Sequence, residues 1–364
     1  MEKVLVAGQT PPPYYGQSIS TQRLLDGQYS KLKLYHVRLA FSRDINEVGR
    51  FNLYKVTHLF AIILRIIYYR FRHSTPVLYY MPVGNNYVPL YRDIIILILT
   101  RWLFKKTVFH FRSAGVSSLY PTLNGLMKIL YRRAFFYPEL GIRLSKGTPP
   151  DGESIYAKRN IIVPNGVEDF YPRYKSKHEK NKVPVILYIG IIMESKGIDT
   201  LLETAAILKK ENYQFKVRLV GKIVSKTYES RIQNIIDNNN LAGIIELPGA
   251  RYDDEKWQEV LGADIFLFPS HFETFGLSVL EAMQFKLPVV ASNVGGLPDL
   301  VVHQKTGFLA EVKNSTDFAE KTTQLLESPK LRENMGQAGR QHYLSSFTVE
   351  KYWKNMERAL TSLH

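Results

Sequence analysis

The sequence predicts an α/β protein made of two doubly wound domains, and three observations support this fold class. Short runs rich in Val and Ile alternate with amphipathic segments through the second half of the chain. Strands that are apolar on both faces are typical of a parallel sheet covered by helices on each side. The chain has 364 residues, enough for two ordinary domains, and its apolar content of 45% suffices for two cores.

The second half of the chain has the more regular pattern. Its expected strands lie at 184–190, 215–221, 244–248, 264–269, 287–292 and 307–310. Its expected helices lie at 198–209, 228–239, 253–261, 276–285, 297–303 and 315–327. This alternation predicts a parallel sheet, and the ligands of such sheets bind at the carboxyl ends of the strands.

The first half begins with an expected strand at 3–8 and continues with strands at 77–81 and 107–111. Its expected helices lie at 17–28, 48–71, 89–104 and 122–136. The polar stretch 165–182 interrupts the periodicity and is the expected linker. We therefore divide the chain into a first domain, residues 1–168, and a second domain, residues 169–348, which face a central cleft.

The net charge of +15 is unevenly distributed along the chain. Residues 1–175 contain 25 Lys and Arg residues and 10 Asp and Glu residues, a balance of +15, whereas residues 176–364 contain 23 of each. All of the excess therefore belongs to the first half. This asymmetry indicates an anionic partner for that half: a membrane surface, a nucleic acid or an acidic substrate.

Several classes of protein are excluded by composition. The chain has no Cys, which rules out disulfides, thiolate metal sites and a Cys nucleophile, and which fits a reducing cytoplasm. No run of about 20 apolar residues is present, so a membrane-spanning helix is not expected. The first residues have too short an apolar run for a signal peptide and are expected to form a strand.

The most informative segment is PSHFETFGLSVLEAM, residues 269–283. It follows an expected strand, crosses a loop that contains Gly276, and enters a helix. Glu273 and Glu281 stand eight positions apart across this junction. A helix start presents unpaired N–H groups and a positive dipole end to an anion, and carboxylates accept hydrogen bonds from hydroxyls. Together these features suit a sugar joined to a nucleoside diphosphate.

The E-x7-E spacing, followed by PVVASNVGGLPDLVVHQKTGFL at 288–309, resembles the retaining GT-B glycosyltransferases of family GT4. Further matching segments occur in order: Val163–Val167, Leu187–Gly190, Lys196-Gly197 and Gly249. The resemblance covers residues 160–364 well and the first 160 residues loosely. It implies two Rossmann-like domains, with a C-terminal helix, 349–364, that packs back on the first domain.

The resemblance also implies roles for individual residues of the second domain. Glu281 is expected to accept hydrogen bonds from the ribose hydroxyls, and Glu273 to face the donor sugar near its anomeric carbon. Lys196, after the turn at Gly190, is expected to neutralise the leaving diphosphate. The backbone N–H groups expected to hold the β-phosphate or the sugar belong to Thr274, Phe275, Gly276 and Leu277.

One position departs from the family pattern. Ile191 stands where members of the family usually have an Arg immediately after the strand-end Gly. We therefore expect another cation to contribute to phosphate binding: Arg251, Arg112 or Lys222.

Two residues of the first domain complete the expected site. Gly16 follows the first strand, where a Gly lets the backbone approach a phosphate. His110 ends a strand, and similar His residues in the family lie near the transferred sugar. The residues expected to take part in catalysis are thus Glu273, His110 and Lys196. The acceptor hydroxyl would attack from the face that the leaving phosphate occupied, and the donor phosphate would take its proton.

No cofactor and no metal are expected, and the nucleotide sugar is a substrate. Asp253-Asp254 is the only adjacent Asp pair, and it opens an expected helix, where acidic residues are common. Lys196 and helix N–H groups are expected to meet the leaving-group charge. UDP is the first choice of carrier and GDP the second.

Residues 48–72 and 89–106 mix aliphatic and aromatic residues with Arg and Lys. This composition suits binding at an anionic bilayer surface, with Tyr68, Tyr69, Phe71 and Trp102 at the interface. The expected acceptor is accordingly a glycan or a lipid-linked saccharide at the inner face of a bacterial membrane, as in surface polysaccharide assembly.

Three alternatives remain open. A nucleic-acid-binding protein would use the basic half, but its cations are scattered over expected helices and no nucleic acid partner is expected. A non-catalytic nucleotide-sugar binder would explain Ile191. An epimerase or a phosphorylase would keep the fold and change the reaction.

Overall fold

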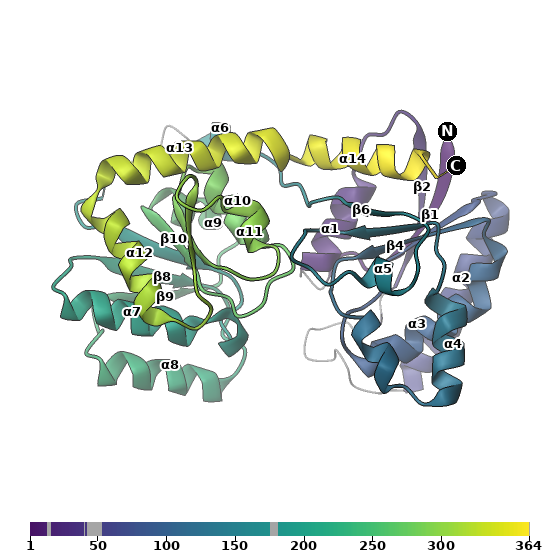
Figure 1. Ribbon diagram of the computed structural model, residues 1–364, viewed down its shortest axis with the longest axis horizontal. Coiled ribbons are helices and arrows are strands. Elements are labelled where there is room, and N and C mark those ends of the chain that lie inside the picture. The colour runs from purple at the N-terminus through teal and green to yellow at the C-terminus, as the bar shows by residue number, and fades with distance from the viewer. Residues whose placement is uncertain (13–15, 40, 42–52, 175–180, 364) are drawn as a thin grey trace. The chain divides into compact units, whose positions relative to one another are not determined.

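The computed structural model describes residues 1–12, 16–39, 41, 53–174 and 181–363, and the chain forms two compact units (Figure 1). Unit 1 comprises Met1–Gly166 and Val349–His364, and unit 2 comprises Val167–Thr348. The first boundary thus lies two residues before the one expected from the sequence. Both units contain a parallel six-stranded sheet with helices on both faces, so the predicted α/β doubly wound fold class is confirmed.

The sheet of unit 1 has the strand order β2-β1-β3-β4-β5-β6. Its strands are β1 (Glu2–Gly8), β2 (Leu32–Arg38), β3 (Val77–Tyr80), β4 (Lys106–Phe111), β5 (Leu140–Arg143) and β6 (Asn160–Ile162). Three of these strands, β2, β5 and β6, were not expected from the sequence. The strand order reverses between β1 and β3, and such a switch point places a crevice at the carboxyl ends of the two strands.

Alternation along β1 separates the two hydrophobic cores of unit 1. Leu5 and Ala7 belong to the core under α2 (Leu53–Arg72), α3 (Tyr87–Thr100) and α4 (Gly125–Phe135). Val4 and Val6 point to the opposite face and belong to the core under α1 (Gly16–Leu25) and α14 (Val349–Thr361). This alternation follows from the period of two along a strand. Both faces of the sheet are therefore covered.

Helix α14 is fixed to unit 1 by buried polar contacts as well as by apolar packing. Arg112, which follows β4, donates to Asn165 Oδ1 and to Tyr352 Oη, both at 2.5 Å. Trp353 Nε1 donates to the carbonyl of Arg23 at 2.7 Å. The guanidinium of Arg112 is buried and forms no ion pair with a carboxylate in the described residues. Its positive charge is therefore held by neutral oxygen atoms at the point where the chain leaves and re-enters unit 1.

The sheet of unit 2 has the strand order β12-β11-β10-β7-β8-β9. Its strands are β7 (Val185–Ile189), β8 (Lys216–Val220), β9 (Ile245–Gly249), β10 (Ile265–Phe268), β11 (Val289–Ser292) and β12 (Gly307–Ala310). Every one of the six corresponds to a strand expected from the sequence. The order reverses between β7 and β10, which is the switch point of this unit.

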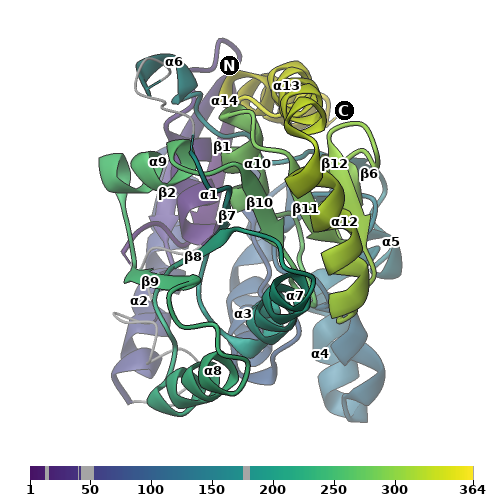
Figure 2. The same cartoon turned by 90° about the vertical axis from the view of Figure 1, so that its left-hand side faces the viewer.

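The helices of unit 2 cover both faces of its sheet. Helices α7 (Ile198–Lys210), α8 (Lys226–Asn238) and α12 (Ser315–Glu327) lie on one face (Figure 2). Helices α9 (Asp253–Leu261), α10 (Leu277–Gln284) and α13 (Pro329–Ser346) lie on the other. The short helices of the chain are α5 (Asp151–Ser154), α6 (Tyr171–Tyr174) and α11 (Leu297–Leu300).

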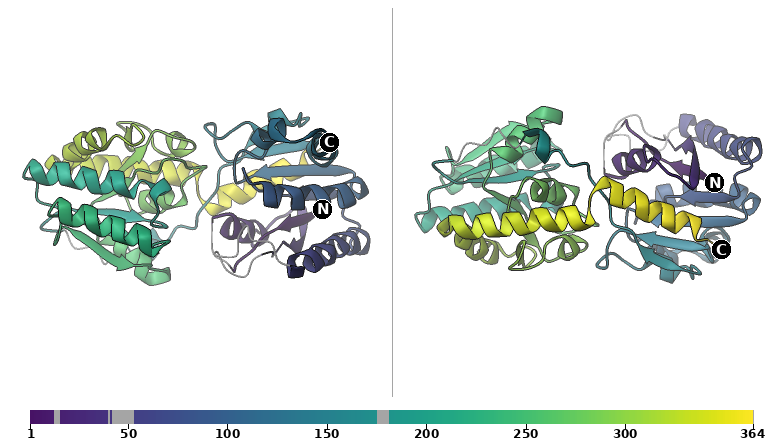
Figure 3. Two further views of the ribbon diagram at one scale, coloured as in Figure 1. Left: turned by 90° about the horizontal axis from the view of Figure 1, so that it is seen from below. Right: turned by 90° about the horizontal axis from the view of Figure 1, so that it is seen from above.

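Helix α13 is an 18-residue element that was not expected from the sequence, and Figure 3 shows it lying along unit 2. Gly336 and Gly339 in its middle resemble helix breakers in a sequence. In the structure, a Cβ added at Gly336 would lie 1.9 Å from the carbonyl oxygen of Lys286. The glycine therefore permits the close packing of α13 against the end of α10.

The expected linker at 165–182 is only partly a linker. Asp169 accepts two hydrogen bonds at 2.7 Å from Arg340, and Phe170 stacks on Trp257 with ring centroids 4.6 Å apart. Residues 167–174 are thus packed into unit 2, whereas 175–180 lie outside the described residues. The expected helix 48–71 begins at Leu53 in the structure, because residues 42–52 also lie outside the described part.

Every helix of the described residues is either too short or too polar to cross a bilayer.

Replacing Tyr352 by Phe tests the buried contact that fixes α14. The change leaves a buried guanidinium N–H without its acceptor, so we expect the free energy of unfolding to fall by about 1.5–3 kcal/mol. Urea denaturation followed by circular dichroism measures this loss. Tyr156→Phe is the matched control, because its side chain is 60% exposed. Equal midpoints for the two variants would contradict the structural role of the contact.

Candidate functional site

The switch point of unit 2 brings together two loops that the sequence places far apart. One loop follows β7 and carries Lys196, and the other follows β10 and carries Glu273. Because β7 and β10 are neighbouring parallel strands, their carboxyl ends lie side by side. The expected ligand-binding residues of this unit therefore come from the edge of the sheet where ligands of such folds bind.

Backbone contacts lock the two loops together. The carbonyl of Ser195 accepts a hydrogen bond from the N–H of His271 at 2.9 Å. Gly197 has a φ of +71°, and a Cβ at this position would lie 1.9 Å from the carbonyl oxygen of Pro269. Only glycine combines that conformation with such a close approach. The turn that presents Lys196 is thus built against the loop that presents Glu273.

The side chains of Lys196 and Glu273 form an ion pair, with Lys196 Nζ 2.7 Å from Glu273 Oε2. Both side chains are mostly shielded from solvent, with exposed fractions of 25% and 16%. The sequence prediction treated them as separate contacts to a donor, and the structure shows that they also contact each other. A cation and a carboxylate therefore stand side by side at the switch point.

A second segment supports the backbone of Glu273. The N–H of Gly296 donates to the carbonyl of Glu273 at 2.9 Å. Gly295 has a φ of +54°, and a Cβ there would lie 1.9 Å from the same carbonyl oxygen. The glycine pair in the 288–309 motif thus holds the backbone of Glu273 and makes no contact that engages its carboxylate.

The loop that carries Glu273 ends at Gly276, where α10 begins. Gly276 has a φ of +98°, and a Cβ there would lie 2.8 Å from Leu297 Cδ2. The N–H groups of Phe275, Gly276 and Leu277 have no hydrogen-bond acceptor among the described residues. Thr274 is half-buried in the same loop. Three unpaired donors and the positive end of a helix dipole thus lie next to Glu273.

Glu281 lies in the second turn of α10 and has its own basic partner. Its Oε1 is 2.9 Å from Lys256 Nζ on α9, and only 13% of its side chain is exposed. The Lys256 ammonium also lies 4.1 Å from the centre of the Trp257 ring. Sequence reasoning missed Lys256 because it lies in an ordinary charged helix, and only the packing of α9 beside α10 identifies it.

The cations that were expected to replace the Arg at position 191 are placed differently. Arg251 pairs weakly with Glu255 and Glu259, at 3.5 and 3.8 Å. Lys222 is exposed, and Arg112 belongs to unit 1, where Asn165 and Tyr352 hold it. Arg112 thus has a structural role in unit 1, and a contact of Arg112 with phosphate stays a prediction.

Two backbone features define the region around Gly190. Its N–H donates to the carbonyl of Val220 at 3.0 Å, and its carbonyl oxygen would lie 1.8 Å from a Cβ at Gly221. Ile191 is 41% exposed, and the buried phenol of Tyr188 donates to its carbonyl at 2.9 Å. The turn after β7 is thus held by backbone contacts while an apolar side chain occupies the expected position of a cation.

In unit 1, His110 is the last residue but one of β4 and is completely buried. Its Nδ1 is 2.5 Å from the hydroxyl of Tyr79, and its Nε2 has no hydrogen-bond partner in the described structure. Burial and then the charge of Arg112 hold the pKa of His110 well below its ordinary value of 6.5. The imidazole is therefore neutral at physiological pH.

The tautomer of His110 follows from the charge beside it. The positive charge of Arg112 acts on both Tyr79 and His110. It attracts the phenolic oxygen of Tyr79, so the hydroxyl hydrogen points towards His110 Nδ1. The ring proton is then on Nε2. A buried N–H donor without a partner lowers the stability of the folded protein by about 1–3 kcal/mol. A bound ligand with an acceptor atom would supply the missing hydrogen bond.

Gly16, the other expected residue of unit 1, is the first residue of α1. It is exposed, and a Cβ at this position would have no atom of the described residues within 4 Å. The fold of unit 1 thus makes no steric demand for glycine here. The described residues also contain no group of three or more His, Asp or Glu side chains arranged for a metal ion.

Part of the chain is similar in sequence to known proteins. Residues 171–342 match the family model described as glycosyl transferases group 1. A capsular polysaccharide biosynthesis glycosyltransferase of Staphylococcus aureus is 29% identical over 176 residues, which are 48% of this chain and 44% of that protein. An N-acetyl-alpha-D-glucosaminyl L-malate synthase of Bacillus anthracis is 39% identical over 170 residues, 44% of each chain. The chain spans about half the length of the curated relatives it matches.

Solved structures resemble the whole chain. Sucrose-phosphate synthase from Thermosynechococcus elongatus has a TM-score of 0.71 at 18% identity and covers 100% of this chain and 99% of its own. Anabaena HepE, crystallised with UDP and glucose, has a TM-score of 0.72 at 17% identity and covers 100% of both chains. At such identities the likeness establishes the fold. Residues 171–342, just under half of the chain, are therefore similar to the group 1 glycosyl transferases, and the two parallel sheets have the GT-B fold.

Proposed function

We propose that the protein is a retaining glycosyltransferase that moves a sugar from a nucleoside diphosphate carrier to a hydroxyl group. The observation that carries this proposal is the Lys196–Glu273 ion pair beside three unpaired N–H groups at the start of α10. A cation and backbone donors suit the diphosphate, and an adjacent carboxylate suits the hydroxyls of the sugar. A nucleotide sugar needs both kinds of group at one edge of the sheet.

Lys196 can bind Glu273 and the diphosphate of a donor at the same time. An ammonium has three N–H donors, and one of them already contacts Glu273 Oε2 at 2.7 Å. The other two remain for the phosphate oxygens. Glu273 in turn has a second oxygen to accept a bond from a sugar hydroxyl. The ion pair therefore positions the two groups for a donor, and binding does not require breaking it.

Glu281 is proposed to accept hydrogen bonds from the ribose hydroxyls. Its contact with Lys256 fixes the carboxylate in one orientation. Lys256 thus acts through Glu281 as a positioning residue. The unpaired N–H groups of Phe275, Gly276 and Leu277, together with the N–H of Thr274, are proposed to hold the β-phosphate, with Gly190 and Arg251 bordering the nucleotide.

In unit 1, we assign His110 as a hydrogen-bond donor to a substrate oxygen. Its depressed pKa and its Nε2 proton make it a poor proton acceptor and a good neutral donor. We propose that Gly16 leaves room for a phosphate at the first turn of α1. The described residues around it would accommodate a Cβ, so their packing does not account for the glycine.

The reaction forms a bond from the acceptor oxygen to the anomeric carbon and breaks the bond from that carbon to the diphosphate. The diphosphate leaves with the bonding electron pair and takes the proton of the acceptor hydroxyl. Glu273 stabilises the positive charge that develops on the sugar ring, and Lys196 with the helix N–H groups stabilises the departing charge. Attack from the leaving-group face retains the configuration. No metal or cofactor is assigned a part.

UDP is the proposed carrier, ahead of GDP, and the compounds bound to Anabaena HepE, UDP and UDP-glucose, support that order. The proposed acceptor is a glycan or a lipid-linked saccharide at the cytoplasmic face of a bacterial membrane. The capsular polysaccharide enzyme among the relatives and the basic first half of the chain support it.

A second candidate function is a nucleotide-sugar binder that does not transfer, or that epimerises the bound sugar. Ile191 favours it, because an exposed apolar side chain occupies the place of an expected phosphate-binding cation. Incubation of the donor with and without an acceptor separates the candidates. A transferase releases the nucleoside diphosphate and forms a glycoside, whereas an epimerase converts the donor and a binder leaves it unchanged.

Replacing Glu273 by Gln or Lys196 by Ala removes the paired charges of the proposed donor site. We expect kcat/KM to fall by about 10²–10³-fold in each variant, the size of a lost electrostatic stabiliser of a transition state. Glu281→Ala should instead weaken donor binding by about 10–100-fold, because it removes hydrogen bonds to a charged acceptor. Coupled detection of released UDP, with titration calorimetry of the donor, measures both quantities. Glu203→Gln, an exposed carboxylate on α7, is the control, and full activity of Glu273→Gln would contradict the proposal.

The leaving-group charge offers a test that needs no mutation. Since Lys196 and backbone N–H groups are proposed to meet this charge, we expect transfer to continue in excess EDTA at its original rate. Loss of activity in EDTA, restored by Mg²⁺ or Mn²⁺, would contradict the proposed metal independence.

The neutral state of His110 predicts a dependence of stability on pH. Its pKa lies lower in the folded protein than in the unfolded chain, so below about pH 6.5 the unfolded chain binds the extra proton and stability falls as the pH falls. His110→Gln should remove a slope of up to about 1.4 kcal/mol per pH unit in that range. Urea denaturation at several pH values from about 5 to about 8 measures this slope. Identical slopes for wild type and variant would contradict a neutral buried His110.

A further inference from the structure

The segment that forms helices α2, α3 and α4 of unit 1, with the strands between them, carries a concentrated positive charge. Residues 53–136 contain twelve Lys and Arg residues and one acidic residue, Asp93, a balance of +11. Asp93 is completely buried, where it accepts bonds from Tyr80 and Arg92. The surface of this segment therefore has no carboxylate of its own to offset its cations.

The same helices expose many large apolar side chains. About half of all such residues in the described part of the chain lie on α2, α3 with the turn that follows it, and α4. Those at the carboxyl ends of the helices are among the most exposed: Tyr68 is 60%, Phe71 is 64% and Trp102 is 75% exposed. A soluble surface rarely gathers so much apolar area, and a gathered patch marks an interaction site.

Two arginines hold the helix ends beside one another. Arg70 on α2 donates to the carbonyl of Leu103 at 2.8 Å, and Arg101 donates to the carbonyl of Ala134 on α4 at 2.9 Å. The indole N–H of Trp102 donates to the carbonyl of Leu99 at 3.2 Å. These contacts join the ends of α2, α3 and α4 into one continuous area. We call it the helix-end surface; it comprises Tyr68, Phe71, Arg72, Trp102, Lys105 and Arg133.

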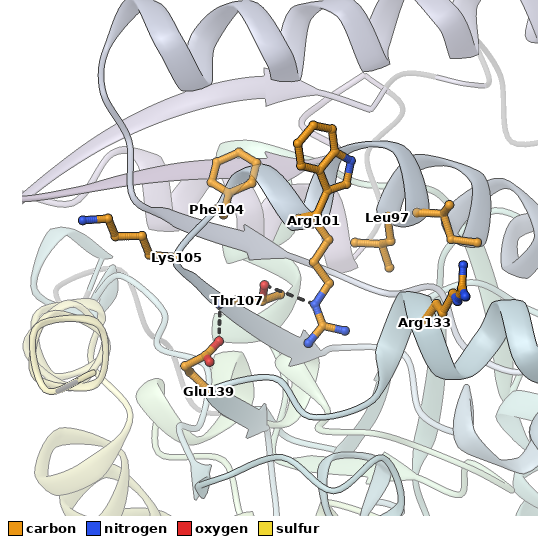
Figure 4. Close-up of a pocket in the computed structure, with 9 residues that line it drawn as sticks. Leu97, Arg101, Phe104, Lys105, Thr107, Arg133 and Glu139 are labelled. Carbon is orange, nitrogen blue, oxygen red and sulfur yellow. Dashed lines mark hydrogen bonds between the residues drawn. The ribbon is translucent and has the colours of Figure 1, made fainter.

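A groove of about 450 Å³ opens within the helix-end surface (Figure 4). Leu97, Trp102 and Phe104 supply apolar walls, and in the view of Figure 4 Lys105 and Arg133 lie on opposite sides of Arg101. Its one acidic lining residue, Glu139, is compensated: it accepts from the N–H of Thr107 at 2.6 Å and from Lys158 at 3.0 Å.

The cations of the helix-end surface are available to a ligand. Arg72, Lys105 and Arg133 are exposed and form no ion pair in the described structure. Each stands close in the chain to an exposed aromatic side chain: Phe71, Trp102 and Tyr137. Exposed aromatics beside unpaired cations are the composition that binds at the boundary between lipid headgroups and acyl chains.

The groove of the helix-end surface lies at one edge of the sheet of unit 1. The groove is lined by Thr107, at the start of β4, and by Glu139, just before β5. It thus lies at the amino edge of the sheet, whereas His110 lies near the carboxyl end of β4. A surface bound there leaves the carboxyl edge, with its proposed substrate contacts, accessible.

We propose that the helix-end surface docks on a bilayer that contains anionic phospholipid, with a lipid phosphate in the groove between Lys105 and Arg133. Phe71 and Trp102 enter the boundary region, and Arg72 contacts headgroups beside them. The inference deepens the proposed function, on which it rests for the lipid-linked acceptor. It names the residues that bring unit 1 to the membrane and the edge of the sheet that faces it.

The test uses the full chain and two kinds of vesicle, one of phosphatidylcholine alone and one that also contains phosphatidylglycerol. Wild type should sediment with the anionic vesicles only. The triple variant Arg72→Gln, Lys105→Gln, Arg133→Gln should bind them about a hundredfold more weakly, from about fivefold for each cation near the surface. Phe71→Ser with Trp102→Ser should weaken binding by about tenfold or more.

Matched variants remove the same charges and apolar groups elsewhere. Lys182→Gln, Lys226→Gln and Lys354→Gln change exposed lysines outside the helix-end surface, and Tyr252→Ser changes an exposed aromatic residue of unit 2. These variants should sediment as wild type does. Equal losses in both sets, undiminished binding of the helix-end variants, or wild type that binds duplex DNA and no vesicle would overturn the proposal.

Donor binding, measured on the same preparations, separates this inference from the proposed function. If the protein binds anionic vesicles but neither binds nor transfers a nucleotide sugar, the docking surface is supported. The lipid-linked acceptor, which rests on the proposed function, is then contradicted. If the protein binds the donor and neither set of variants changes sedimentation with vesicles, the docking surface alone is contradicted.

Discussion

An ion pair between Lys196 and Glu273, 2.7 Å long, is the contact on which the functional interpretation depends. It exists because the strand order of unit 2 reverses between β7 and β10, so the loops after these strands meet at one edge of the sheet. Three glycines make the meeting possible. Gly197 and Gly295 let backbone approach the loop of Glu273, and Gly276 turns that loop into α10. The motif glycines are therefore explained by the close packing of the loop that carries Glu273.

The alternation of apolar and amphipathic segments predicted every strand of unit 2, because parallel strands buried on both faces stand out in a sequence. The E-x7-E motif likewise placed Glu273 and Glu281 correctly before and within α10. What the sequence did not reveal depends on packing between distant segments. Lys256 contacts Glu281 only because α9 lies beside α10. Gly336 lies within α13 at the point where this helix packs closely against the carbonyl of Lys286. Short edge strands such as β6, three residues long, give too weak a pattern to detect.

The charge balance of the sequence assigns the positive excess to the first half of the chain, but it does not distinguish buried from exposed cations. Arg112 contributes to the excess and is committed to holding Asn165 and Tyr352 inside unit 1. Arg70 and Arg101 cap carbonyls at helix ends. Arg72, Lys105 and Arg133 remain exposed beside aromatic side chains. The basic half thus contains cations that stabilise unit 1 and cations that are available to a partner. The buried charge of Arg112 also affects His110, whose pKa it helps to lower.

A crystal structure of the full chain with a nucleoside diphosphate sugar is the most direct test of the central claim. The account predicts a diphosphate oxygen within hydrogen-bond distance of Lys196 Nζ and of the N–H groups at Phe275, Gly276 or Leu277, with a sugar hydroxyl on Glu273 and the ribose on Glu281. A nucleotide bound at another edge of the sheet, with the Lys196–Glu273 pair untouched by ligand, would contradict it.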